Sequence, residues 1–182
     1  LLKKFKVEFV ATTDDPTDGL NDHGRYGALS VAPTFRPDKL YDFSEEYLEL
    51  LGRSAGIKIE CLSDMLAALT LRLEYFVKKG CRIADHGFER FPKNYADEKE
   101  AAKLFEKRCG LTVEEREKLF GFLLVWLTKE YQKRGILMQL HFSVIRNNNK
   151  AMFEKCGVDS GFDLIGEEQS VKDLARYFNQ IE

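Results

Sequence analysis

The sequence lacks the features that mark several common protein classes. It has only three histidines, and no two of them are near neighbours. Its four cysteines are far apart and form no close pair of the metal-binding or redox type, so reduced thiols are the expected state, although spacing alone leaves a disulfide open. No glycine-rich phosphate loop or dinucleotide fingerprint is present, which argues against kinases and dehydrogenases. We also expect no strained strand-to-helix serine turn of the serine-hydrolase type.

Charge and hydropathy exclude two further classes of partner. The net charge is −2, the pI is near 6.0 and no basic stripe is present, so we expect no nucleic-acid partner. No apolar run approaches the length of a membrane span, and no charged leader with an apolar core is visible. We therefore expect no membrane partner and a cytoplasmic location. The length of 182 residues suits one domain.

The sequence does contain β-rich runs that end in charged, imidazole or amide side chains. These runs cover residues 6–13, 29–35, 81–84 and 136–141. Helical patterns lie between them, and alternating strands and helices predict a parallel sheet. Because the carboxyl ends of parallel strands meet at one edge, we expect one shared pocket there.

Helical periodicity and capping signals predict six helices. The pattern is helical over residues 44–51, 61–79, 96–109, 112–134, 149–155 and 170–179. Ser44 is the expected cap of the first helix, which we expect to end before Gly52. Thr112 and Glu115 form a capping box that opens the fourth helix, and Gly135 ends it.

The residues at the strand ends match a known family. They are Thr12-Thr13-Asp14-Asp15-Pro16, Pro33-Thr34-Phe35-Arg36-Pro37-Asp38-Lys39, Asp85-His86-Gly87, Met138-Gln139-Leu140-His141 and Arg146-Asn147-Asn148-Asn149, followed by Gly161-Phe162-Asp163. In this order they resemble the uronate isomerases, often called glucuronate isomerases, of the amidohydrolase superfamily. The resemblance covers nearly the whole chain.

The resemblance implies a fold and a place for the chain within a longer enzyme. We expect an α/β fold, namely a partial TIM (β/α)8 barrel with roughly strands three to six. Residues 1–182 would form a single partial barrel domain, with extra helical insertions at about 40–79 and 90–134. The family chain is more than twice as long, so we expect an internal part of it that is inactive alone.

The resemblance also implies an activity and a cofactor. The activity is aldose–ketose isomerisation of D-glucuronate to D-fructuronate and of D-galacturonate to D-tagaturonate, with a small-molecule sugar acid as partner. A divalent metal, with zinc the expected ion, would be held mainly by residues outside this chain, because the family's His-x-His and eighth-strand Asp are not found here. A homo-oligomeric parent is left open. The alternatives are a metal-dependent hydrolase or deaminase of the superfamily, or a non-catalytic barrel remnant.

Three residues are candidates for binding a sugar acid. Arg36 ranks first, because its planar fork can make two charge-assisted hydrogen bonds to a carboxylate. The ordinary alternative is a surface arginine paired with Asp38. Arg146 and Asn148 are candidates for a clamp on hydroxyls or the carboxylate, and the ordinary alternative is a polar loop that caps the next helix through Asn149.

Three further residues, His86, His141 and Asp14, are candidates for catalysis. His86 and His141 suit acid–base work or the holding of metal-bound water, and a hydrogen-bonded structural histidine is the ordinary alternative. Asp85 is expected to point to the opposite sheet face from His86, which makes it the weaker candidate of the two.

The third catalytic candidate is Asp14. One carboxylate of the pair Asp14 and Asp15 is expected only to cap local backbone amides before Pro16, and the other to order the pocket or to neighbour the metal. His23 matches a family histidine and is expected to support the site from its loop.

Overall fold

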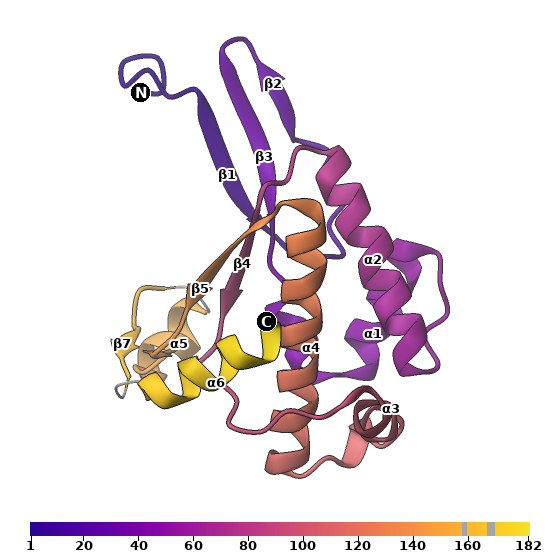
Figure 1. The fold of residues 1–182 in the computed structure, drawn as a ribbon. Coiled ribbons are helices and arrows are strands. Elements are labelled where there is room, and N and C mark those ends of the chain that lie inside the picture. Colours follow the sequence, from indigo (N-terminus) through magenta and orange to yellow (C-terminus); the bar gives the residue numbers. More distant parts are fainter. Residues whose placement is uncertain (158–159, 167–169) are drawn as a thin grey trace.

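A parallel sheet with helices packed on one face forms the body of the chain (Figure 1). The computed structural model describes residues 1–157, 160–166 and 170–182. The strands are β1 (Phe9–Asp14), β2 (Gly24–Tyr26), β3 (Leu29–Phe35), β4 (Ile83–Gly87) and β5 (Leu137–His141). β1, β3, β4 and β5 pair in that order and in parallel, and the short β2 pairs with β3 in the antiparallel direction. This order is that of four consecutive strands of a (β/α)8 barrel.

Helices occupy both long connections between the strands. The first connection holds η1 (Asp38–Asp42), α1 (Glu45–Ala55) and α2 (Leu62–Lys78). The second holds α3 (Glu98–Glu106), η2 (Arg108–Gly110) and α4 (Val113–Arg134). After β5 come β6 (Val144–Ile145), α5 (Lys150–Cys156), β7 (Leu164–Ile165) and α6 (Val171–Ile181). No helix among the described residues is both long enough and apolar enough to cross a bilayer.

Most of the predicted helix starts are confirmed. The Ser44 hydroxyl accepts a hydrogen bond from the Tyr47 amide at the start of α1. Thr112 and Glu115 form the reciprocal capping box of α4. Asn149 caps α5 through the Met152 amide. Side chains of this kind satisfy amides that have no partner within the helix, which is why they mark its first turn in the sequence.

The predicted end of α1 at Gly52 is wrong. The helix continues to Ala55, and Gly56 ends it with a left-handed backbone, φ 70°. Gly52 serves close packing instead, because a Cβ at this position would lie 2.5 Å from the Ile57 carbonyl oxygen. A glycine that is required for space gives the same signal in a sequence as a glycine that ends a helix.

The stretch Gly52-Arg53-Ser54-Ala55-Gly56 matches the letters of the serine-hydrolase motif. It lies in the last turn of α1 and not at a strand-to-helix turn. The Ser54 hydroxyl donates to the Leu51 carbonyl 2.8 Å away, within the same helix. This segment therefore has none of the strained geometry that exposes a nucleophilic serine.

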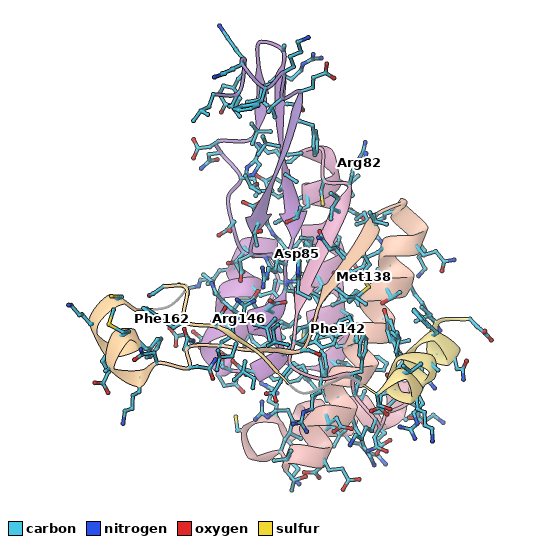
Figure 2. All side chains as sticks on the ribbon, turned by 90° about the vertical axis from the view of Figure 1, so that its left-hand side faces the viewer. Arg82, Asp85, Met138, Phe142, Arg146 and Phe162 are labelled. Atoms are coloured by element: carbon cyan, nitrogen blue, oxygen red, sulfur yellow. The ribbon has the colours of Figure 1, made fainter. Side chains whose placement is uncertain are left out.

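The two faces of the sheet have different surroundings. Phe35 packs against Phe76 of α2 and Tyr131 of α4, and all three side chains are buried between the sheet and the helices. On the other face, alternate residues of β1 and β5 are exposed, including Phe9 and Leu137. Figure 2 views the sheet from this side, with the helix layer behind it. The open face corresponds to the interior of a complete barrel.

β4 lies further along the chain than predicted, and this changes where its side chains point. The sequence predicts a strand over 81–84, whereas β4 covers Ile83–Gly87 and pairs as far as Gly87 with His141 of β5. Asp85 and His86 therefore lie within the strand, on opposite faces.

His86 lies in the core between the sheet and the helices. Its imidazole is fully buried, with Nε2 2.9 Å from the Tyr131 hydroxyl and Nδ1 hydrogen-bonded to the Tyr41 hydroxyl. A neutral imidazole can donate from one ring nitrogen and accept at the other, so both hydroxyls are satisfied. Burial, with a smaller contribution from the Arg36 charge, lowers the pKa of His86 to about 3.

This buried histidine should make the fold sensitive to acid. The unfolded chain takes up a proton on His86 near its ordinary pKa of 6.5, whereas the folded chain takes it up only near 3. Between these values the unfolded state binds more protons, so stability should fall as the pH falls, by up to about 1.4 kcal/mol per pH unit. His86→Gln should keep its helical circular dichroism signal to a lower pH than the unsubstituted chain does. An unchanged acid midpoint in a folded variant would contradict the prediction.

The sheet edges should make residues 1–182 unstable by themselves. In the part of the chain that the structure describes, the outer edges of β1 and β5 have no paired strand, and Leu137 on the open face is 69% exposed. Unpaired edges and uncovered apolar surface favour association over a fixed fold. We expect a broad thermal transition and self-association in size-exclusion chromatography. A monomer with a sharp melting transition would contradict this.

Candidate active site

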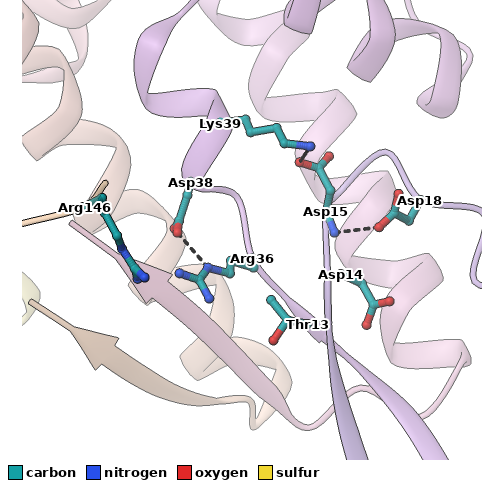
Figure 3. Close-up of a pocket in the computed structure, with 8 residues that line it drawn as sticks. All are labelled: Thr13, Asp14, Asp15, Asp18, Arg36, Asp38, Lys39 and Arg146. Atoms are coloured by element: carbon teal, nitrogen blue, oxygen red, sulfur yellow. Dashed lines mark hydrogen bonds and ion pairs between the residues drawn. The ribbon is translucent and has the colours of Figure 1, made fainter. Parts of the chain in front are cut away.

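A polar hollow of about 390 Å³ lies at the carboxyl ends of β1 and β3 (Figure 3). It is lined by Thr13, Asp14, Asp15, Asp18, Arg36, Asp38, Lys39 and Arg146. A second hollow of about 350 Å³ lies at the ends of β4 and β5 and includes His141 and Gly87. Arg146 lines both, so the two hollows adjoin. The strand ends therefore meet at one site, as the sequence predicts.

Arg36 follows β3 directly and its side chain lies between two carboxylates. Nε donates to Oδ2 of Asp38 at 2.7 Å, and Nη1 donates to Oδ2 of Asp85 at 3.2 Å. The Arg36 amide donates to the Asp14 carbonyl at 2.9 Å, which ties its backbone to β1. About a quarter of the Arg36 side chain is exposed, so the guanidinium is held in place and still meets the hollow.

Asp85 joins Arg36 to His141. Its other oxygen, Oδ1, lies 2.6 Å from Nε2 of His141, although the N–H direction is too poorly aligned to count as a regular hydrogen bond. The Asp85 side chain is 8% exposed and that of His141 is 43% exposed. The imidazole is thus accessible, and a nearly buried carboxylate supports it from below. The sequence pattern ranks Asp85 below His86, and this ranking is wrong, because Asp85 contacts Arg36 and His141 whereas His86 is fully buried.

The His86 imidazole does not reach this site. The parallel register pairs Phe35 with Ala84, and residues at positions 84 and 86 of β4 share the face that packs on the helices. His86 is therefore the hydrogen-bonded structural histidine of the ordinary alternative. The prediction that its side chain converges with Arg36 and His141 is wrong. β4 continues to Gly87, so His86 lies within the strand and its side chain points toward the helices.

Asp14 also turns away from Arg36, as Figure 3 shows. Its Oδ2 accepts a hydrogen bond from the Thr12 hydroxyl at 2.6 Å, and its Oδ1 lies 3.4 Å from Nε2 of His23. His23 thus supports Asp14 from the loop after β1. Asp15 caps the local turn, since its Oδ1 accepts from the Thr17 amide at 3.0 Å. One of the two carboxylates thus caps the backbone as expected, but Asp15 does not do only that, because it also accepts from the Tyr47 hydroxyl at 2.9 Å.

The two candidates after β5 have different positions. Nη1 of Arg146 donates to Oδ2 of Asp163 at 2.7 Å, and its side chain reaches the hollow next to Arg36 and Asp38 (Figure 3). Asn148 lines neither hollow. Its side-chain amide donates to the Ile145 carbonyl and its backbone amide to the Phe162 carbonyl, so it holds the β6–β7 segment together.

Asp38 and Gly87 are site residues to which the sequence pattern assigns no role. The Oδ1 atom of Asp38 accepts a hydrogen bond from the Gly87 amide at 2.9 Å, which links the ends of β3 and β4. The spacing of Asp38 two residues after Arg36 is a usable signal, but it reads as an ordinary surface ion pair. The contact with Gly87 is 49 residues away and has no local signal.

The described residues do not fit a complete metal site. Nowhere among them do three His, Cys, Asp or Glu side chains come together as ligands for an ion. Asp85 and His141 form one pair of such side chains, and the Arg36 charge beside Asp85 opposes a cation there. A zinc ion takes at least three protein ligands.

Known proteins match this chain along its whole length. The family model described as glucuronate isomerase matches residues 1–182. The uronate isomerase of Histophilus somni is 39% identical over 196 residues, and the match covers 100% of this chain and 42% of that protein. The uronate isomerase of Shouchella clausii is 38% identical, with 100% and 41% covered.

Two solved structures share the fold. The crystal structure of uronate isomerase from Thermotoga maritima superimposes with a TM-score of 0.90 at 30% identity, covering 98% of this chain and 42% of that one. Glucuronate isomerase from Caulobacter crescentus gives 0.85 at 26% identity, covering 98% and 39%. The chain thus spans about two fifths of the length of these relatives. On the match along its whole length, this chain belongs to the glucuronate isomerase family.

Proposed function

We propose that these 182 residues form the sugar-acid-binding part of a uronate isomerase, which interconverts D-glucuronate with D-fructuronate and D-galacturonate with D-tagaturonate. The observation that carries the proposal is the Arg36 guanidinium, which is held at the pocket between Asp38 and Asp85 and is linked to His141 through Asp85. Relatives named uronate isomerase support it. The term complete enzyme denotes a chain that contains these residues and the remaining strands of the barrel.

Arg36 is the proposed partner of the substrate carboxylate. The residues that line its hollow include four aspartates and three cations, so the hollow has no excess of positive charge. Selection of a carboxylate would therefore rest on the geometry of the guanidinium fork, which offers parallel N–H donors. Arg146, at the border of the two hollows, is the proposed second contact for the sugar acid.

His141 is the proposed proton carrier. Aldose–ketose isomerisation moves one proton from C2 to C1 and one from O2 to O1, and a side chain that can both accept and return a proton suits this work. Asp85 lies against Nε2 and would fix the ring so that Nδ1 faces the substrate. His141 is accessible from the second hollow, as this role requires.

The cofactor and location remain proposals of the same kind. A divalent metal, with zinc the expected ion, would polarise substrate oxygens in the complete enzyme. Because the described residues supply no complete ligand set, we assign no step of the reaction to it. A cytoplasmic location agrees with the four cysteines, which are all free thiols.

Substitution of Arg36 tests the proposed function directly. Arg36→Lys keeps the charge and loses the fork, so in the complete enzyme kcat/KM for D-glucuronate should fall at least tenfold, or about 1.4 kcal/mol of transition-state binding. Arg25→Lys, on the exposed strand β2, is the matched control and should leave kcat/KM unchanged. An unchanged kcat/KM in Arg36→Lys would refute the assignment.

Substitution of Asp85 tests the role of His141. Asp85→Asn keeps an oxygen for Arg36 but removes the carboxylate that orients the imidazole, so kcat should fall by about tenfold or more. Asp22→Asn, an exposed aspartate in the loop before β2, makes the same change of charge away from the site. Steady-state kinetics of the complete enzyme separates kcat from KM. An unchanged kcat in Asp85→Asn would show that catalysis by His141 does not depend on the Asp85 carboxylate.

A further inference from the structure

Asp38 bridges the ends of two strands with one carboxylate. Its Oδ1 accepts from the amide of Gly87, the last residue of β4, at 2.9 Å, and its Oδ2 accepts from Nε of Arg36, directly after β3, at 2.7 Å. Both acceptor atoms therefore have a defined partner. A carboxylate held by a backbone amide on one side has little freedom to follow a moving guanidinium, so it fixes that guanidinium.

The turn that carries Asp38 is itself anchored in the core. Leu40, two residues later, is fully buried, and the Tyr41 hydroxyl is hydrogen-bonded to the buried His86. The position of Asp38 is thus set by core packing and by β4, not by the exposed surface. This distinguishes it from a surface ion pair, whose two long side chains move freely.

Gly87 leaves the space in which the guanidinium lies. A Cβ at this position would be 2.6 Å from Nη2 of Arg36 and 2.9 Å from Oδ2 of Asp38. The backbone of Gly87 does not have a positive φ, so backbone conformation does not require a glycine here. The absence of a side chain is therefore needed for close approach of Arg36 to the strand end.

We propose that Asp38 is a positioning residue that fixes the plane of the Arg36 guanidinium for a carboxylate ligand, and that Gly87 is required for that arrangement. The proposal rests on the proposed function, in which Arg36 binds the sugar acid. Nε and Nη1 are held by Asp38 and Asp85, so the orientation of the fork is set before the ligand arrives. A preorganised donor loses less freedom on binding.

A double-mutant cycle in the complete enzyme tests whether Asp38 acts through Arg36. Asp38→Asn has only one side-chain oxygen, so when that oxygen accepts from the Gly87 amide the side-chain NH2 group faces Nε of Arg36, and two donors oppose each other. We expect kcat/KM for D-glucuronate to fall about tenfold, mainly through KM. Asp38→Asn combined with Arg36→Lys should be no worse than Arg36→Lys alone, because the two residues act as one unit.

Asp42→Asn is the matched control, since Asp42 is an exposed aspartate on the same turn. Additive effects of Asp38→Asn and Arg36→Lys would overturn the proposal, because they would show that Asp38 does not act through Arg36. Equal losses in Asp42→Asn and Asp38→Asn would also overturn it, since charge alone would then explain the effect.

A second variant covers the case in which Asp38→Asn fails to fold. Gly87→Ala retains Asp38, but its Cβ crowds both the Arg36 guanidinium and the Asp38 carboxylate, so it should raise KM for D-glucuronate by about tenfold. Gly110→Ala adds the same methyl group in open space and should leave KM unchanged. An unchanged KM in folded Gly87→Ala would contradict the proposal.

A measurement without substrate separates this proposal from the proposed function. The Arg36 Nε–H resonance of the complete enzyme should be protected from solvent exchange, and Asp38→Asn should remove that protection. If protection is lost but no variant changes turnover of D-glucuronate, the positioning is supported and the proposed function fails. If Arg36→Lys impairs turnover while Asp38→Asn leaves both protection and KM unchanged, the positioning proposal fails alone.

Discussion

The alternation of side chains along β4 is the constraint on which the site depends. Asp85 faces the open side of the sheet, where it contacts Arg36 and His141, and His86 faces the helices, where it is fully buried. The parallel register with β5, which pairs Gly87 with His141, determines which face of the sheet each β4 side chain occupies. A shift by one residue would bury the Asp85 charge in the core and expose the imidazole. The same strand therefore supplies one residue that holds the pocket side chains Arg36 and His141, and the next residue to the core.

The pocket is built from charges that compensate one another before any ligand is present. Arg36 lies between Asp38 and Asp85, and Lys39 lies 3.5 Å from Asp15. Such networks hold long side chains in defined positions at the cost of net attraction for an anion. Under the proposed function, recognition of a sugar acid would depend on where the N–H groups point. This explains why residues that touch Arg36, and not only Arg36, belong to the site.

The local features of the fold could be predicted from the sequence, but which residues of β4 face the pocket and which face the helices could not. Ser44, Thr112 and Asn149 cap helices through amides three residues away, so their signal is local. The strand ends that carry Arg36 and His141 are likewise identified by composition. The face of Asp85 depends on pairing with β5, more than fifty residues further along the chain. The contact between Asp38 and Gly87 is also non-local. The prediction at Gly52 fails for a different reason, because a glycine that is needed for close packing looks the same in the sequence as a glycine that ends a helix.

A crystal structure of the complete enzyme with bound D-glucuronate is the most direct test of the central claim that Asp85 and not His86 belongs to the site. We expect the sugar-acid carboxylate against the Arg36 guanidinium, with His141 near C1 and C2 of the sugar and in contact with Asp85. His86 should remain between Tyr41 and Tyr131, out of reach of the ligand. A ligand in contact with the His86 imidazole, or one bound away from Arg36, would contradict this description of the site.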